Sequence, residues 1–250
     1  MKEVNIYGEI FKRKSIRKYK QDAFNAETIA QIEDYINNIQ PIFPEAKVEY
    51  KVITGDQIKG LIPFTCPKAP YAIAAIGKQD KKSLLNVGYV LEFVDLFFSG
   101  NDIGSLWAGS AKLRKKDDDP NNSLLMVKLF GIANEPLHRT GLSQFKRKGI
   151  RDISDILDID EFLNYVRYAP SAMNSQNYFL KGNKNEFDIS RLPVGALKEK
   201  MYANMNTIDV GIVCAFIKVI SDHQGYSVSF FIDKQKENDN HYLISVKLGA

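Results

Sequence analysis

The chain has little of the residues that mark several common classes of protein. Among its 250 residues there are only two cysteines, Cys66 and Cys214, far apart and without a CxxC spacing. A reduced, intracellular setting is therefore favoured over a disulfide framework. The three histidines, His138, His223 and His241, are scattered along the sequence and indicate no metal cluster.

Long apolar runs and a strong charge bias are also lacking. The longest uncharged apolar run, Val210 to Ile217, is far too short to span a bilayer. The N-terminus is basic but has no apolar stretch typical of a signal peptide. Thirty-four basic residues against thirty acidic ones leave a net charge of only +4, which does not indicate a nucleic-acid partner. We expect a soluble protein of the cytoplasm with neither a membrane nor a nucleic acid as partner.

Two kinds of functional sequence motif are absent as well. No GxGxxG follows a predicted strand, so a Rossmann dinucleotide fold is not supported. There is no nucleophile elbow and no Cys-His signature of a hydrolase. What remains is an ordinary globular composition, 44% apolar and 26% charged, in a chain long enough for a buried core in one domain or two.

Periodicity predicts alternating helices and strands. Asn25 is a suitable N-cap for a helix that ends before Pro41. Residues 1–20 are expected to be extended, 112–119 to form a solvated loop or helix end, and 136–149 to be a connector. Helices are predicted at 25–40, 83–99, 158–168 and 204–221, and strands at 48–54, 69–77, 124–132, 226–233 and 241–248, with a strand or turn at 106–109. This alternation favours an α/β or α+β sandwich.

An internal repeat organises the chain. The octapeptide Phe11–Lys18 recurs as Phe145–Asp152 with six of eight positions identical. A helical pattern follows each copy, and the later stretch Asn86–Val90 is echoed by Asp209–Val213. We interpret these as two diverged copies of one unit and expect the domains to be 1–150 and 151–250, the second shorter and more diverged.

The first segment with a clear chemical meaning is Arg13-Lys14-Ser15-Ile16-Arg17. Two arginine guanidinium groups, a lysine and a hydroxyl at this spacing suit a phosphate group, because a guanidinium can hold two phosphate oxygens at once. A plain basic surface stretch is the alternative, and on this segment alone it would be preferred.

The second segment is Ala169-Pro170-Ser171-Ala172-Met173-Asn174-Ser175-Gln176. Pro170 ends the preceding helix, and the polar side chains that follow offer closely spaced hydrogen-bonding groups. The small residues Ala169 and Ala172 would let the backbone approach a flat ring. An ordinary polar loop after a helix is the alternative.

Together the two segments resemble the nitroreductase-like flavoproteins, in which an Arg-x-Ser-x-Arg segment and an Ala-Pro-Ser-x-x-Asn loop meet around FMN. Gly104–Gly109 is similar to that family's strand along the flavin ring, although Asp102 stands where glycine is common and Trp107 is equally well explained as a core aromatic residue. Phe145–Lys148 resembles the family's closing segment, whose basic pair often completes the phosphate site. The resemblance implies FMN as cofactor, bound by Arg13, Lys14, Ser15, Arg17, Trp107, Ala108, Gly109, Lys146, Lys148, Pro170, Ser171, Ala172 and Asn174.

The resemblance also implies an architecture. Family members are three-layer α/β/α sandwiches that form homodimers with an FMN site at each subunit interface. Because this chain contains both halves, we expect a nitroreductase-like α+β fold whose two half-repeats form an internal pseudo-dimer, and hence a monomer. One site would combine the motifs at 13–17 and 170–174. The other would use Arg147, Gly149 and Arg151 with residues 36–40, which lack Pro-Ser, and it has lost both partners.

The function implied is that of an FMN-dependent NAD(P)H oxidoreductase. The flavin supplies the hydride chemistry, so no catalytic side chain and no metal ion are expected. NADH or NADPH would be the donor, and nitroaromatic, quinone or flavin compounds the acceptors, in a ping-pong cycle. Two alternatives remain: a non-catalytic flavin-binding sensor or binding module, and a structural protein without flavin.

Overall fold

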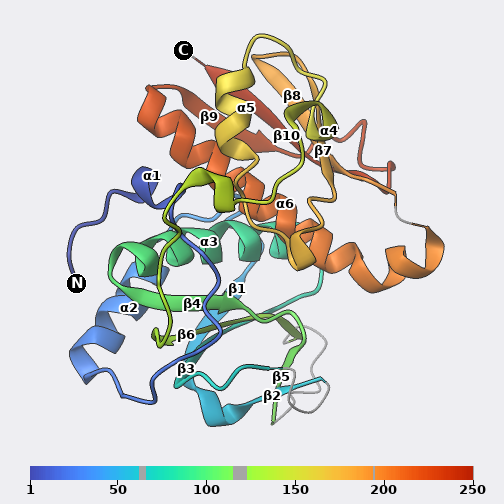
Figure 1. Ribbon diagram of the computed structural model, residues 1–250. Helices are drawn as coiled ribbons and strands as arrows, with labels where there is room; N and C mark the ends of the chain where they lie inside the picture. The colour runs from blue at the N-terminus through green and yellow to red at the C-terminus, as the bar shows by residue number, and fades with distance from the viewer. Residues whose placement is uncertain (62–65, 115–122, 194, 250) are drawn as a thin grey trace. The chain divides into compact units, whose positions relative to one another are not determined.

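The protein folds into two compact units, Met1–Gln144 and Phe145–Ala250. The computed structural model describes residues 1–250 except 62–65, 115–122, 194 and 250 (Figure 1). The second unit therefore begins at Phe145, the first residue of the recurring octapeptide, six residues before the boundary expected from the sequence (151 − 145 = 6).

Unit 1 is a four-stranded antiparallel sheet with helices. Its strands follow the order β1-β3-β6-β4, and a separate two-stranded ribbon pairs β2 with β5. The elements are α1 (Ile6–Glu9), α2 (Ala26–Asn38), β1 (Val48–Thr54), η1 (Gly55–Gln57), β2 (Ile58–Gly60), β3 (Tyr71–Gly77), α3 (Lys81–Gly100), β4 (Ile103–Trp107), β5 (Ala111–Leu113), β6 (Ser123–Ile132) and η3 (Leu142–Gln144).

The helices of unit 1 begin at capping side chains. The side chain of Asn25 accepts a hydrogen bond from the Thr28 amide at the start of α2, and that of Asp80 accepts one from Ser83 at the start of α3. Helix α3 is buried on almost all sides, which explains why its sequence is largely apolar. The hydroxyl of Tyr50 donates to the carbonyl of Asn86, which joins β1 to α3.

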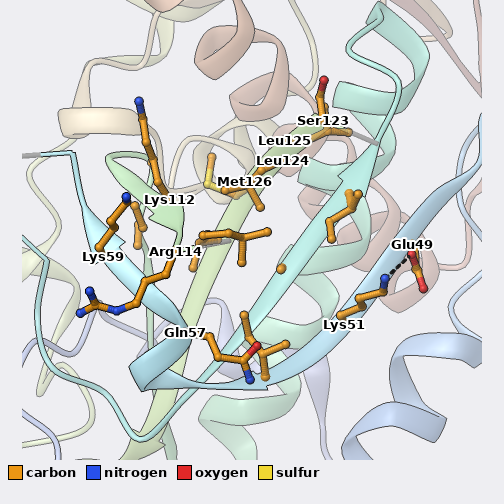
Figure 2. A pocket seen from close by; sticks show the side chains of 18 of the residues that line it. Glu49, Lys51, Gln57, Lys59, Lys112, Arg114, Ser123, Leu124, Leu125 and Met126 are labelled. Carbon is orange, nitrogen blue, oxygen red and sulfur yellow. Dashed lines mark ion pairs between the residues drawn. The ribbon is translucent and has the colours of Figure 1, made fainter. Parts of the chain in front are cut away.

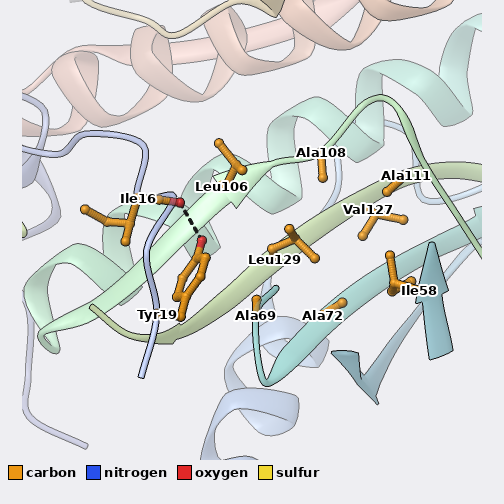
Figure 3. Packing of buried hydrophobic residues seen from close by; sticks show 10 residues of the cluster. All are labelled: Ile16, Tyr19, Ile58, Ala69, Ala72, Leu106, Ala108, Ala111, Val127 and Leu129. Carbon is orange, nitrogen blue, oxygen red and sulfur yellow. Dashed lines mark hydrogen bonds between the residues drawn. The ribbon is translucent and has the colours of Figure 1, made fainter. Parts of the chain in front are cut away.

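A hydrophobic cluster joins the sheet of unit 1 to the ribbon and to the N-terminal segment (Figure 3). It draws residues from β2, β3, β4, β5 and β6. The Tyr19 hydroxyl donates to the Ile16 carbonyl at 2.7 Å within it. Its buried members are Ile16, Tyr19, Ile58, Ala69, Ala72, Leu106, Ala108, Ala111, Val127 and Leu129. The cluster therefore fixes the segment between Arg13 and Tyr19 onto the sheet.

Unit 2 has a second four-stranded antiparallel sheet, in the order β7-β8-β10-β9. Its elements are α4 (Ile150–Ile153), α5 (Asp160–Val166), η4 (Ala172–Asn174), β7 (Tyr178–Gly182), β8 (Glu186–Arg191), α6 (Ala196–Gln224), β9 (Ser227–Phe231) and β10 (Tyr242–Gly249).

The two units share one connectivity. In each, a helix and a loop lead into two strands, a long helix and two more strands, if the β2-β5 ribbon of unit 1 is set aside. In each sheet the strands lie in the order first, second, fourth, third along the chain. This is the relationship expected of two diverged copies of one unit.

Several expected elements differ from those observed. Residues 1–20 contain the short helix α1, and β7 and β8 were not predicted although Phe187 and Ile189 alternate with polar residues. Helix α6 begins at Ala196, eight residues before the predicted start (204 − 196 = 8). Strand β4 ends at Trp107 and is followed by a turn. Of the charged run 112–119, Lys112 and Leu113 belong to β5, and residues 115–119 lie outside the described residues.

Two helices have the length and apolar composition that a bilayer span would need, Lys81–Gly100 and Tyr202–Gln224. Both are mostly buried within the protein, as core helices of a soluble protein are. Because buried core helices share this length and composition, these two properties are weak evidence for a membrane span.

Candidate functional site

The basic segment Arg13–Arg17 lies along strand β4 in unit 1. The amide of Ile16 donates to the carbonyl of Ser105 at 2.8 Å. Gly104 permits this approach, because a Cβ at that position would lie 2.9 Å from the Ile16 side chain. The structure thus brings together two of the stretches that the sequence singles out, the basic segment and Gly104–Gly109.

Arg13 is not on the surface but belongs to a buried charge cluster, which we call the Asp95 cluster (Arg13, Glu92, Asp95, Ser105 and Lys128). Asp95 Oδ2 lies 2.7 Å from Arg13 Nε, and its Oδ1 lies 2.7 Å from Lys128 Nζ. The hydroxyl of Ser105 also donates to Asp95. All five residues are buried. Two cations therefore share one carboxylate in the interior.

The charges of the cluster depend on one another. Burial would raise the pKa of Asp95, but Arg13 and Lys128 outweigh it and hold this pKa below its usual value. Burial lowers the pKa of Lys128, against the attraction of Asp95. For Glu92, burial and the charge of Asp95 together raise the pKa to about 8. Glu92 is therefore largely protonated at neutral pH, while Asp95 is ionised.

The remaining side chains of the basic segment are accessible. Arg17 is exposed, and Lys14 and Ser15 are half-buried. The Ser15 hydroxyl lies 3.5 Å from Arg13 Nη2, which donates to it. Because the Arg13 guanidinium is paired with Asp95, the groups open to an anion are Lys14, Ser15 and Arg17.

The predicted ring-facing stretch Trp107–Gly109 follows directly from β4. Trp107 is half-buried, with Lys128 Nζ 4.2 Å from the centre of its ring. The Ala108 amide donates to Val127 at 2.9 Å, and Gly109 is exposed in the turn that leads to β5. Ala108 and Gly109 both line a cavity of about 1090 Å³.

This cavity lies over β1, β3 and β6 and is bordered by the β2-β5 ribbon. Figure 2 shows Lys59, Lys112 and Arg114 together on one side and the ion pair of Glu49 with Lys51 on the other. Much of its lining is apolar: Ile53, Ala74, Ile76, Ala108, Ala111, Leu113, Leu124, Leu125, Met126 and Val127. Its rim is thus mainly cationic around an apolar floor.

In unit 2 the second basic segment is bound to the loop Pro170–Gln176. Lys148 donates from its amide to Gln176 Oε1 at 2.7 Å and from Nζ to the Gln176 carbonyl at 3.0 Å. Asn174 Nδ2 donates to the Lys146 carbonyl at 2.7 Å, and Arg147 donates to Asn174 Oδ1. The structure therefore brings the candidates Lys146 and Lys148 next to the candidate loop, and only the side chain of Lys146 is exposed.

The loop itself has an unusual backbone. Met173, Asn174 and Gln176 have positive φ angles of 53°, 57° and 45°, although none is glycine. Such conformations are costly and persist where the surroundings over-determine them. Here the Ser171 hydroxyl accepts from the Gln176 amide at 2.9 Å, and Met173 is 86% exposed at the tip.

A buried carboxyl fixes the start of this loop. The Ala172 amide lies 2.9 Å from Oδ1 and 3.1 Å from Oδ2 of Asp209, on helix α6. In unit 1 the amide of Phe43 donates in the same way to Asn86 Oδ1, on α3, at 2.9 Å. Asn86 and Asp209 are the residues that correspond in the repeat.

These contacts correct the predicted counterpart of the loop in the first half. Residues 36–38 form the last turn of α2, so 36–40 is not the corresponding loop. The loop held by Asn86 is 39–47, in which Pro41 is retained and Ile42 stands in the place of Ser171. The comparison of the two halves by sequence placed this loop too early in the chain, because the helical pattern of α2 continues into residues 36–38.

The other two residues of the second, diverged motif are, like Arg147, engaged locally in unit 2. Arg151 donates to the Ile156 carbonyl at 2.6 Å and forms an ion pair with Asp160. The Gly149 amide donates to Asp152 Oδ2 at 2.9 Å.

Sequence reasoning missed Glu92, Asp95, Lys128 and the role of Asp209. Each is an ionisable residue within an otherwise apolar run, and that pattern was a usable signal, because such residues are rarely buried without a partner.

Comparisons with known proteins agree with the motifs. The family model described as "Putative TM nitroreductase" matches residues 5–221. A "putative nitroreductase" of known structure from Thermotoga maritima is 18% identical, with a TM-score of 0.68 over 100% of this chain and 96% of that chain. This similarity shows the nitroreductase fold.

Two further solved structures are more distant. A nitroreductase with bound FMN from Desulfitobacterium hafniense is 13% identical, with a TM-score of 0.45 over 59% of this chain and 100% of that one. An FMN-dependent nitroreductase from Clostridium difficile is 19% identical, with a TM-score of 0.40 over 50% of this chain and 85% of that one. No curated protein matches the chain. Because the family model covers most of the sequence, this chain belongs to the TM nitroreductase family.

Proposed function

We propose that the protein is an FMN-dependent oxidoreductase that oxidises NADH or NADPH and reduces a nitroaromatic, quinone or flavin acceptor with ping-pong kinetics. When bound, FMN supplies the hydride-transfer chemistry, and the protein supplies binding and orientation. FMN-bound and FMN-dependent nitroreductases among the similar structures agree with this choice of cofactor.

The observation that carries the proposal is the backbone of the loop Pro170–Gln176. Three non-glycine residues with positive φ in four positions mark a conformation that local preferences oppose. Backbone strain of this kind clusters at ligand clamps. In a chain of this family, the flavin ring is the ligand that such a loop would contact, through Pro170, Ser171, Ala172 and Asn174.

The donor set of the first segment fits a phosphate. Lys14, Ser15 and Arg17 present one ammonium, one hydroxyl and one guanidinium within four residues, and none is fully buried. We assign the phosphate to these three side chains, and to Arg13 the task of fixing the segment through Asp95. Lys146 and Lys148 are further candidates for contact with the phosphate.

The stretch Trp107–Gly109 is assigned to the ring. Ala108 and Gly109 carry little or no side chain, so their backbone can approach a flat molecule closely. The indole Nε1 of Trp107 is buried and interacts with the carboxyl group of Glu92, which partly opposes the rise in the pKa of that group.

The test is a titration of the purified protein with FMN, followed by fluorescence quenching, and then an assay of NADH and NADPH oxidation with a quinone or a nitroarene. Binding together with turnover supports the proposal. Binding without turnover indicates a flavin-binding module instead, and no binding rejects a flavin role. Arg17→Ala and Ser171→Ala should both weaken FMN binding, whereas Arg151→Ala, which removes a guanidinium paired with Asp160, is the matched control.

A further inference from the structure

A single buried carboxyl group on helix α6 anchors the loop Pro170–Gln176. Asp209 is 4% exposed, and both its oxygens lie within 3.1 Å of the Ala172 amide. Ala172 immediately precedes Met173, the first residue with a positive φ. The contact therefore acts at the point where the backbone enters its strained turn.

The corresponding loop of unit 1 provides a comparison for the contact between Asp209 and Ala172. There Asn86 accepts from the Phe43 amide and also donates from Nδ2 to the carbonyls of Phe43 and Ala46, at 2.8 and 3.1 Å. No residue of the loop 39–47, all of which the structure describes, has a positive φ. A neutral amide thus holds a relaxed loop through three hydrogen bonds, whereas in unit 2 a carboxyl group holds a strained one through a single amide.

The surroundings of Asp209 do little to offset the cost of burying its charge. Tyr178 of β7 lies in the electrostatic field of Asp209, and its hydroxyl is itself buried and also lies in the field of Arg147. Burial raises the pKa of Asp209 to about 7, and the hydrogen bond from Ala172 opposes this only partly. Both protonation states are therefore accessible near neutral pH.

We propose that Asp209 is the positioning residue for the loop, that its carboxylate form holds the strained turn, and that uptake of a proton loosens it. An ionised carboxylate accepts the Ala172 amide more strongly than a neutral acid does, and it offers two equivalent oxygens. The consequence for FMN affinity rests on the proposed function, but the effect on the loop itself does not.

The first experiment is amide hydrogen exchange of the full chain at about pH 8.5, where the group is ionised. Asp209→Leu should speed exchange in peptides covering 170–177 by at least about tenfold, the loss of one hydrogen bond to a charged acceptor. Asp209→Asn should change it by less than about threefold, because the amide oxygen still accepts, as that of Asn86 does. Asp222→Asn is the control, since Asp222 lies on the same helix but pairs with Lys218 at the surface.

The second experiment compares the protection of the loop at about pH 5.5 and about pH 8.5, after correction for intrinsic exchange. Wild type should lose several-fold protection at the lower pH, and Asp209→Asn should show a flat profile. The same pH profile in both proteins, or unchanged exchange in Asp209→Leu, would overturn the proposal. If Asp209→Leu does not fold, the pH dependence of loop exchange in Asp209→Asn, compared with wild type, is sufficient to test the proposal.

A third measurement links the loop to the flavin. The Kd for FMN should rise at least about fivefold in Asp209→Leu and stay unchanged in Asp222→Asn, because a mobile loop must be ordered on binding. An unchanged Kd would overturn the positioning role. If wild type binds no FMN at all, the proposed function fails, while the exchange results still decide the role of Asp209 in the loop.

Discussion

Arg13 and Asp95 form an ion pair in the interior of unit 1, with Nε and Oδ2 2.7 Å apart and both side chains at most 2% exposed. Asp95 also holds Lys128, so removal of either cation leaves a buried charge only partly compensated. This relationship gives Arg13 a structural role that its position in a basic surface motif conceals.

Arg13→Ala should therefore lower the free energy of unfolding by about 3–5 kcal/mol, the cost of breaking a buried pair on one side. Chemical denaturation with urea measures this. Lys18→Ala is the neighbouring control and should cost less than about 1 kcal/mol, because the lysine is exposed. A loss for Arg13→Ala as small as that for Lys18→Ala would contradict the structural role.

Arg17→Ala should leave stability nearly unchanged and weaken FMN binding by roughly 1.5–3 kcal/mol, the scale of a hydrogen bond to a charged group. Riboflavin lacks the phosphate, so its affinity should hardly change. The two affinities are compared by fluorescence titration of the same variant. Equal losses for both ligands would show that Arg17 does not act on the phosphate.

One FMN per chain is expected to saturate the protein. The first half keeps the Arg-x-Ser-x-Arg segment and the second half keeps the Pro-Ser loop, whereas their counterparts carry Gly149 and Ile42. Arg151 is also engaged with Asp160. Absorbance of the saturated protein after removal of free flavin measures the ratio, and two flavins per chain would reject the unequal roles of the two motifs.

The sequence predicted those elements whose signals are local. Strand β1 has the predicted bounds, and α2 begins after the predicted cap at Asn25, because a period-2 pattern and a capping side chain act over a few residues. Strands β7 and β8 were missed, since short alternating segments compete with turn signals on either side. The family was also predicted from two short motifs, and the family model confirms it.

The buried interactions could not be read from the same patterns. Residues 95 and 128 are brought together by the pairing of β6 in the centre of the sheet and by the packing of α3, which no local pattern encodes. For this reason Arg13 was predicted only as a ligand of the FMN phosphate. The contact of Ala172 with Asp209 likewise joins residues 37 positions apart.

Lys112→Glu should stabilise the β2-β5 ribbon. Lys59 and Lys112 are register partners on adjacent strands, and like charges directly opposite one another are destabilising. A glutamate opposite Lys59 replaces this repulsion with attraction, for a gain of roughly 0.2–1 kcal/mol at low salt. Urea denaturation at low and high salt checks this, with Lys112→Gln as the control. A gain that persists undiminished at high salt would not be electrostatic.

Glu92 should make the protein less stable as the pH rises. Its pKa is raised from 4.5 to about 8 in the folded protein, mainly by burial and then by the charge of Asp95. Between these two values the folded state retains a proton that the unfolded state has released, so the free energy of unfolding falls as the pH increases through this window. The full effect is on the order of 5 kcal/mol, and it is reached above the folded pKa.

Glu92→Gln stays neutral at every pH and should remove this decline. The variant and wild type should have similar stability near about pH 4.5 and diverge steadily up to about pH 8, with the variant the more stable. Asp209 titrates in both proteins and cancels in the difference between the two urea-denaturation curves, which therefore reports Glu92 together with its coupling to Asp95 and Lys128. Parallel pH profiles would mean that Glu92 is already ionised in the folded protein, and the cluster would then hold two carboxylates against its two cations.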